Sequence, residues 1–219
     1  MTFPKSIRVF LAAPYTQWMD FAAGTVDPCW RFRLEAIRCT LMEMGAEVFS
    51  AHHNESWGAQ WLDADVCTPV DFAAMLASDV VCAIVGQPPS GGVTVELGWA
   101  SALGKPTLMV VSPGASRTPL LTGLGTVTAV KQLDEPVSWH RAEIAEIAAQ
   151  TLTMVGREAE GEPQPQPQPQ PSIRRLAGTA RLVEHHLSFC SSQRCRHKPP
   201  LTDLATVTGR PRAHDRSSA

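Results

Sequence analysis

The sequence predicts an α/β protein in which a parallel sheet of about five strands is covered by helices on both faces. Short apolar runs rich in β-branched residues alternate along residues 7–155 with segments of helical periodicity. Parallel strands need such crossovers, so this alternation favours a parallel sheet over a sandwich or a bundle. The chain has 219 residues and 44 % hydrophobic content, which suffices for one substantial core but not for two full-size domains.

The expected elements follow from apolar spacing and from helix-end signals. Thr68-Pro69 is a typical N-cap and first-turn pair, and Gly45 and Gly104 each follow a helical pattern. Ligands of such folds bind beyond the carboxyl ends of the strands, where the helices begin. The expected strands are 7–13, 46–51, 80–85, 107–111 and 126–130, and the expected helices are 30–44, 68–77, 93–103 and 143–155.

The net charge of −2 hides a strong asymmetry between the two ends of the chain. Residues 1–162 carry 10 Lys and Arg against 18 Asp and Glu, a net of −8, whereas residues 163–219 carry 9 against 3, a net of +6. We therefore expect an acidic globular part and a solvated basic tail. The basic patch is too unspecific to predict nucleic-acid binding, and none is expected.

The domain organisation is indicated by the run EPQPQPQPQP, which favours an extended linker because alternating proline cannot pack into a helix or a sheet interior. We expect a globular domain over residues 1–157, a Pro/Gln-rich linker over 158–171 and a basic, mostly disordered tail over 172–219. Five tail residues bear potential zinc ligands, but their spacing fits no recognised pattern, so no metal is expected. They are His185, His186, Cys190, Cys195 and His197.

No targeting or membrane segment stands out. No apolar run approaches the roughly 18 residues of a membrane span, and none resembles a secretory leader. The six cysteines have no disulfide-framework spacing for so long a chain. A cytoplasmic protein without membrane contact is therefore the expectation.

A glycine-rich turn is the most informative feature of the sequence. The buried run 80–85 leads into Ser90-Gly91-Gly92 and then directly into a helical pattern. Backbone N–H groups at such a helix start attract phosphate or another anion, and the Ser90 hydroxyl adds a donor. A tight turn also has a purely steric use for glycine, so the motif alone leaves both explanations open.

Two carboxylates are expected near that turn. Glu96 lies in the first turn or so of the helix, where an acid is either a partner of the helix dipole or a nucleophile for an electron-poor carbon. Asp71 is expected in the first turn of the preceding helix, at the same edge of the sheet. Asp79 directly precedes a strand and is expected at the opposite edge, as a turn or capping residue.

Three segments resemble the nucleoside 2-deoxyribosyltransferase superfamily, including its 5′-monophosphate N-glycosidase branch. The resemblance rests on FLAAPY, the Asp71 helix and GQPPSGGVTVELGWASALGKP, and it covers roughly residues 9–124. Within that branch, AHHNESWGAQW and VELGWASALGKP are most similar to CMP and hydroxymethyl-CMP hydrolases of nucleoside antibiotic biosynthesis. The resemblance implies a Rossmann-like (flavodoxin-like) subunit, a homodimer with active sites near the interface, no cofactor, and double displacement at the anomeric carbon.

The resemblance also implies residue roles. Glu96 matches the nucleophile, and Asp71 matches the aspartate that manages the proton of the leaving base. Many members have a tyrosine in the first strand that hydrogen-bonds the nucleophile; this chain has Phe10 there, and Tyr15 could supply the hydroxyl. Ser90 and Gly92 match 5′-phosphate contacts, with Gly91 between them, His52 matches a ligand-side histidine at the end of the second strand, and Thr122 falls where the family supplies contacts across a dimer interface. Apart from the resemblance, Glu55 is either an acceptor for an exocyclic amine or a solvated charge, and Trp57 and Trp61 either stack on the base or pack in the core.

The leading functional hypothesis is hydrolysis of a pyrimidine ribonucleotide, CMP first, to free base and ribose 5-phosphate. The same chemistry also allows another nucleotide, or base exchange by a nucleoside or nucleotide (deoxy)ribosyltransferase. A third possibility from a different class is a non-catalytic nucleotide sensor whose tail recruits a partner.

Overall fold

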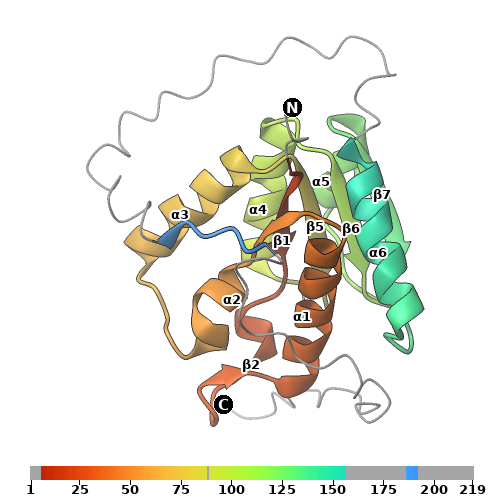
Figure 1. Ribbon diagram of the computed structural model, residues 1–219. Helices are drawn as coiled ribbons and strands as arrows, with labels where there is room; N and C mark the ends of the chain where they lie inside the picture. Colours follow the sequence, from red (N-terminus) through yellow and green to blue (C-terminus); the bar gives the residue numbers. More distant parts are fainter. Residues whose placement is uncertain (1–5, 88, 156–185, 192–219) are drawn as a thin grey trace, which may run out of the picture.

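A five-stranded parallel sheet forms the centre of the molecule (Figure 1). The computed structural model describes residues 6–87, 89–155 and 186–191. A separate antiparallel pair is formed by β2 (Met19–Asp20) and β3 (Thr25–Val26). The predicted class, an α/β fold with a parallel sheet of about five strands, is confirmed. In spatial order, the sheet contains β4 (Glu47–Phe49), β1 (Arg8–Ala12), β5 (Val80–Val85), β6 (Thr107–Val111) and β7 (Val130–Asp134).

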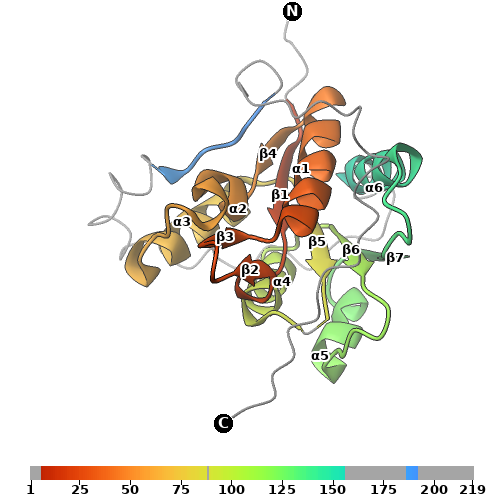
Figure 2. The ribbon, with the colours of Figure 1, turned by 90° about the horizontal axis from the view of Figure 1, so that it is seen from below.

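Helices cover both faces of the sheet (Figures 1 and 2). Residues of α1 and α6 pack on one face, and residues of α3, α4 and α5 pack on the other. Among the helices of the described segments, none is long and apolar enough to cross a membrane. The helices are α1 (Pro28–Glu43), α2 (Ala51–Asn54), α3 (Ala64–Ala77), α4 (Gly91–Ala102), α5 (Pro119–Thr122) and α6 (Arg141–Thr153).

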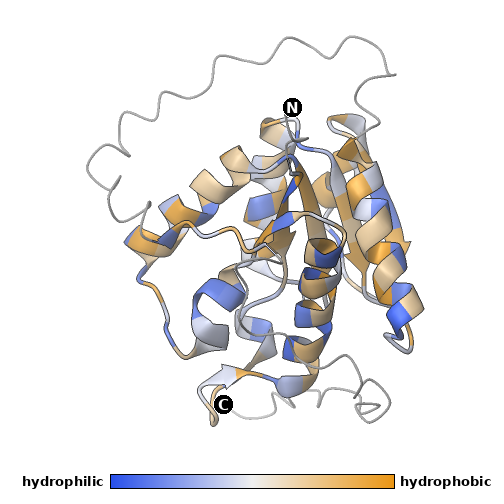
Figure 3. Cartoon of the chain, viewed as in Figure 1, coloured by the Kyte–Doolittle hydropathy of each residue, from blue (hydrophilic) through white to orange (hydrophobic). Residues whose placement is uncertain are grey.

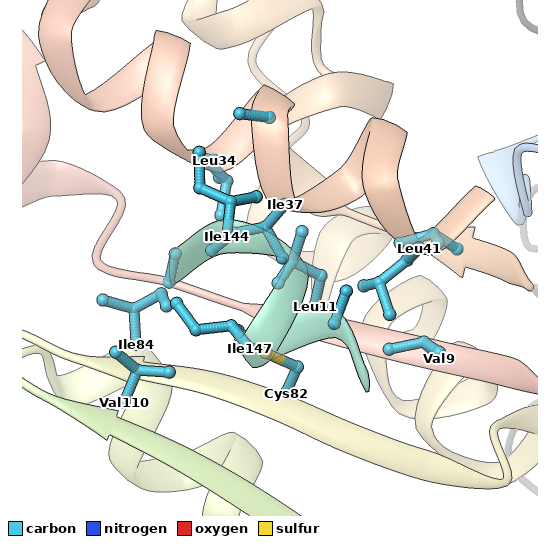
Figure 4. Close-up of a cluster of buried hydrophobic side chains, with 14 of the residues drawn as sticks. Val9, Leu11, Leu34, Ile37, Leu41, Cys82, Ile84, Val110, Ile144 and Ile147 are labelled. Carbon is cyan, nitrogen blue, oxygen red and sulfur yellow. The ribbon is translucent and has the colours of Figure 1, made fainter. Parts of the chain in front are cut away.

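The larger of the two cores lies between the sheet and the α1–α6 layer (Figure 4). The central strands are coloured mostly as hydrophobic, whereas the helices mix hydrophobic and hydrophilic residues (Figure 3). Both faces of a parallel sheet are buried, which explains the continuous apolar run of β5. Each buried aliphatic side chain contributes about 1.5–3 kcal/mol. The ten labelled residues belong to this core. They are Leu34, Ile37 and Leu41 of α1, Ile144 and Ile147 of α6, and Val9, Leu11, Cys82, Ile84 and Val110 of the strands.

The strand order places a topological switch point between β1 and β5. Numbered by sequence within this sheet, the order is 2-1-3-4-5, the doubly wound arrangement of flavodoxin-like folds. The chain leaves β1 toward β4 on one side and leaves β5 toward β6 on the other. The connections after β1 and β5 therefore diverge, and a crevice opens beyond the carboxyl ends of these two strands.

The helix that carries Asp71 begins earlier than predicted. The sequence suggested Thr68 as its N-cap, but α3 starts at Ala64 after Asp63 and contains Pro69 in its interior. Proline deprives the carbonyl four residues earlier of its partner. That carbonyl belongs to Asp65, which is exposed in the first turn and accessible to water. Asp71 consequently lies in the middle of α3 rather than in its first turn.

Two strand boundaries also differ from the prediction. The expected strand 46–51 is divided into β4 and the short helix α2, which begins at Ala51. The expected strand 126–130 is wrong, because the chain forms a 3₁₀ turn at Leu124–Thr126 and the strand follows at Val130–Asp134. β7 is a half-exposed edge strand with polar residues, so it lacks the apolar run that marks the central strands.

Part of the tail contacts the globular domain, which the sequence did not predict. Residues 186–191 lie beside β4, and Val48 and Cys190 exchange two backbone hydrogen bonds of 2.8 Å. These six residues are an ordered part of a tail that was expected to be mostly disordered. The predicted linker over 158–171 and the rest of the tail lie outside the described residues.

Candidate active site

A cavity of about 340 Å³ lies at the switch point. Its wall comes from the segments that follow β1, β4 and β5 and from the first half of α3, all at the carboxyl edge of the sheet. This is the position that the topology predicts for a ligand site, and the volume is in the range of small-molecule sites. The cavity is lined by Leu11, Ala13, Tyr15, Ala51, His52, Glu55, Trp61, Leu62, Ala64, Cys67, Asp71, Ser90, Gly92, Val93 and Glu96.

Glu96 presents a carboxyl group to this cavity from the second turn of α4. α4 starts at Gly91 because the side chain of Ser90 caps the helix by accepting a hydrogen bond from the Val93 amide at 3.4 Å. Glu96 Oε2 is buried and has no hydrogen-bond partner among the described residues. Burial, and secondarily the charge of Asp71, raise the pKa of Glu96 from 4.5 to about 8. A buried carboxyl without a partner is costly, which is typical of a functional group rather than of a structural one.

Asp71 faces the same cavity from α3. Burial, and secondarily the charge of Glu55, raise its pKa from 3.8 to about 7. Near neutral pH the cavity therefore contains carboxyl groups that can hold or release protons. Two acids with shifted pKa values in one cleft are the arrangement that acid–base catalysis requires.

Asp79 serves a structural purpose at the opposite edge of the sheet. Its Oδ2 accepts a hydrogen bond of 2.8 Å from the Arg8 amide, and its own amide donates to the Arg8 carbonyl at 2.8 Å. The carboxylate thereby fixes the start of β1 beside the start of β5. The prediction that Asp79 lies away from the ligand edge is confirmed.

Tyr15 and Glu55 form a hydrogen-bonded pair in the wall of the cavity. The Tyr15 hydroxyl donates to Glu55 Oε2 at 3.2 Å. The Tyr15 hydroxyl is thus committed to Glu55, and the expectation that it hydrogen-bonds Glu96 is corrected. Glu55 is 6 % exposed, and burial raises its pKa. Glu55 also lines the cavity, and its carboxyl group has acceptor positions beyond the one that Tyr15 uses.

His52 is neutral and supports Tyr15. Its Nε2 lies 3.0 Å from the Pro14 carbonyl oxygen, which can only accept, so Nε2 carries the proton. Burial lowers the pKa of His52 to about 4, and its ring stacks on Tyr15 with 4.3 Å between centroids. His52 therefore lines the cavity, as predicted, and packs behind the Tyr15 ring.

The glycines of the turn are not required by the fold itself. Neither Gly91 nor Gly92 has a positive φ. A Cβ at Gly91 would meet no atom within 4 Å, and one at Gly92 would meet only Ser90 Oγ at an ordinary 3.7 Å. Glycine near a helix start costs stability relative to alanine. Neither glycine is therefore needed for steric reasons within the fold. Both leave free space beside the backbone at the start of α4.

Four residues assigned to substrate binding do not line the cavity. Phe10 is 0 % exposed and stacks on Phe49 in the core beneath α3 and α4, because alternate residues of β1 point to opposite faces. Trp57 is 6 % exposed and packs in the core, with the Arg31 guanidinium over its ring at 5.2 Å. Gly91 and Thr122 are exposed outside the cavity of the single chain.

Trp61 is the tryptophan at the cavity. It is 51 % exposed and tilts against Tyr15 with ring centroids 4.8 Å apart. The sequence left both Trp57 and Trp61 open as the stacking residue. An exposed aromatic ring beside a cavity is suited to stacking on a planar ligand.

Cys67 is a lining residue that the sequence reasoning missed. It lies one helical turn before Asp71, and burial raises the pKa of its thiol. The spacing of four residues would have identified it, had the start of α3 been predicted at Ala64 rather than at Thr68.

The charge of the cavity wall is entirely acidic. Three carboxyl groups line it, and no lysine or arginine is found among the described lining residues. An anionic group must therefore bind through neutral donors, and the amides at the start of α4 provide them. The site can thus hold an anion at one end and present two titrating carboxyl groups to the adjoining atoms.

Fold and site together define a flavodoxin-like α/β protein with paired carboxyl groups beside a helix N-terminus. The solution structure of BlsM is similar, with 33 % identity, a TM-score of 0.61, and coverage of 73 % of this chain and 98 % of that one. The CMP N-glycosidase BcmB of Clostridium botulinum has 27 % identity and a TM-score of 0.47, over 67 % of this chain and 98 % of that one. No protein-family model matches the sequence, and no curated protein matches it significantly. The chain belongs to the nucleoside 2-deoxyribosyltransferase superfamily, in its 5′-monophosphate N-glycosidase branch.

Proposed function

We propose that the protein hydrolyses the N-glycosidic bond of a pyrimidine nucleoside 5′-monophosphate, CMP first, to the free base and ribose 5-phosphate. The observation that carries the proposal is the convergence of Glu96 and Asp71, with raised pKa values, on the cavity that also exposes Ser90 and Gly92. Membership of the N-glycosidase branch supports the same reaction class.

The reaction proceeds in two displacements. An ionised oxygen of Glu96 attacks the anomeric carbon, the carbon–nitrogen bond breaks, and the base leaves with the bonding pair and a proton from Asp71. A glycosyl-enzyme ester on Glu96 results. Water then attacks the anomeric carbon, Asp71 takes a proton from it, and Glu96 departs as a carboxylate. This division of work between two carboxyl groups is that of retaining glycosidases.

The 5′-phosphate occupies the start of α4 in this proposal. Backbone amides and the helix dipole favour an anion there without any side-chain cation. The sugar then lies between the phosphate and the base, beside Glu96. The base occupies the remaining part of the cavity, where Glu55 accepts from an exocyclic amine and Trp61 stacks on the ring.

A non-catalytic sensor is disfavoured by the state of Glu96. Its buried Oε2 has no partner, so keeping this group in the cavity lowers stability, and its ionised form also lowers the affinity for an anion. A protein that only binds the nucleotide gains nothing from this arrangement. Hydrolysis uses it directly.

The test of the proposal is a comparison of CMP, UMP, dCMP and cytidine as substrates, with free base measured by chromatography. We expect release of cytosine from CMP and much slower release from cytidine, because the nucleoside lacks the anion that α4 binds. A second free base added to the mixture distinguishes exchange from hydrolysis, since exchange yields a new nucleotide. Binding of CMP without release of base would contradict the proposal.

Alanine variants of Gly91 and Gly92 test whether the space beside Gly92 is needed for the ligand or only for folding. Gly92→Ala is expected to raise the free energy of unfolding by about 0.5–1 kcal/mol, because alanine favours the helix. It should also raise KM for CMP, because the new methyl group enters the cavity beside the phosphate position. Gly91→Ala is the matched control: its stability should rise equally while KM stays the same. Equal kinetics in both variants would contradict the assignment of Gly92 to the phosphate.

A further inference from the structure

Residues 186–191 run beside the open edge of the sheet, where Cys190 forms an isolated antiparallel β-bridge with Val48 (Figures 1 and 2). β4 is the edge strand beside β1, and its outer backbone groups need partners or water. The Val48 amide donates to the Cys190 carbonyl and the Cys190 amide donates to the Val48 carbonyl, both at 2.8 Å. This antiparallel pairing is the cis equivalent of strand addition by a peptide. We refer to residues 186–191 as the strap.

Side chains of the strap extend the contact. Phe189 lies 5.8 Å from Phe49 between ring centroids, and Phe49 in turn stacks on Phe10 at 5.2 Å. The Arg8 guanidinium lies 5.4 Å from the Phe189 centroid. Leu187 also packs against this core. The strap therefore buries aromatic surface at the edge of the sheet as well as pairing backbone groups.

The strap also contacts the helix that carries one wall of the cavity. Asn54 Nδ2 donates to the Ser188 carbonyl at 3.2 Å. Asn54 is the last residue of α2, and the next residue is Glu55, whose amide donates to Ala51 at 2.9 Å. Phe49, at the end of β4, is two residues before Ala51. The strap therefore contacts both β4, through Val48, and α2, through Asn54.

We propose that the strap is a positioning element for the cavity: it holds α2, and with it His52 and Glu55, in the geometry that binds the base. The proposal rests on the proposed function for its kinetic part. The hydrogen bonds of the strap go to β4 and α2, whereas Glu96 and Asp71 lie on α4 and α3. Loss of the strap is therefore expected to weaken substrate binding rather than to slow the chemical step.

The matched pair of variants is Cys190→Pro and Cys190→Ala in the full chain. Proline removes the amide that donates to Val48, whereas alanine keeps it and controls for the loss of the thiol. For Cys190→Pro we expect KM for CMP to rise about 5- to 10-fold with kcat changed less than about 2-fold. Cys190→Ala should match the unaltered protein. Phe189→Ala and Asn54→Ala are milder variants that remain informative if the proline variant does not fold, and each should raise KM in the same direction.

Amide hydrogen exchange provides a readout that does not depend on turnover. In Cys190→Pro, the amides of Val48, Asn54 and Glu55 should exchange at least about 10-fold faster than in Cys190→Ala, while those of α4 stay unchanged. Faster exchange at Val48 with unchanged KM, or no change in exchange, overturns the positioning role. If no variant or unaltered protein releases base, the proposed function fails, and faster exchange at Asn54 and Glu55 still decides whether the strap holds the cavity wall.

Discussion

Glu96→Ala is expected to abolish nucleotide hydrolysis while preserving nucleotide binding. The nucleophile contributes only once the carbon–nitrogen bond begins to break, so kcat should fall roughly 10⁴-fold or more. The dissociation constant of CMP should stay within a few-fold near pH 7, because Glu96, with a pKa of about 8, is mostly uncharged there and repels the phosphate little. Single-turnover release of cytosine and calorimetric titration measure the two quantities. Asp79→Asn is the control acid, since Asp79 lies at the other edge of the sheet.

The covalent step has a direct signature. A 2′-deoxy-2′-fluoro analogue of CMP destabilises the oxocarbenium-like transition states, and its slow second step should leave a fluorinated sugar phosphate on the peptide that contains Glu96. Mass spectrometry detects this adduct in the unaltered protein and should find none in Glu96→Ala. Rapid hydrolysis by Glu96→Ala, or an adduct on another residue, would remove Glu96 from the mechanism.

The same side chain has a predicted effect on stability. The pKa of Glu96 is about 8 in the folded protein against 4.5 for an unperturbed carboxyl, so the folded state holds the proton more tightly. The contribution of this group to stability is therefore present at low pH and is lost as the pH rises from about 4.5 through about 8. Glu96→Gln removes this loss, so its advantage in Tm over the unaltered protein should grow between pH 5 and pH 9.

The sequence was sufficient for the sheet and for the ligand edge because both follow from strong local patterns. β5 and β6 are continuous apolar runs and were located to the residue. Glu96 and Asp71 were placed at one edge by the direction of the chain alone. Edge elements were harder: β7 is half-exposed and polar, and the strap gains its structure only from pairing with β4. Structure that depends on tertiary contacts of this kind produces no hydrophobic periodicity in the sequence of a short segment.

Side-chain direction was the other limit of the sequence. Phe10 and Leu11 are neighbours on β1, yet Leu11 lines the cavity and Phe10 lies in the opposite core. Trp57 and Trp61 are four residues apart in an irregular segment where no periodicity defines a buried side. A positive φ at Trp57 turns that ring inward, and no sequence signal predicts such a conformation for tryptophan.

Asp71→Asn is expected to slow hydrolysis strongly and to change its pH dependence. Asparagine keeps the shape of the side chain but has no proton to give to the base, so kcat should fall roughly 10²- to 10⁴-fold. Glu96 must be ionised, so the rate of the unaltered protein rises as the pH rises through about 8. Asp71 must be protonated, so the rate falls as the pH rises through about 7. The product of these two requirements is a bell with its maximum near pH 7.5, between the two values.

The variant should lose one limb of this bell. Without the Asp71 carboxyl, kcat/KM should rise with pH and then stay level, with the midpoint below 8 because the charge that helps to raise the pKa of Glu96 is gone. The loss of rate should also be smaller for 5-fluorocytidine 5′-monophosphate than for CMP, because the fluorinated base leaves more readily without a proton. An equal loss for both substrates, together with a bell of unchanged shape, would show that Asp71 acts on substrate position and that the leaving base obtains its proton from another group. Glu55, the third acid that lines the cavity, is the candidate.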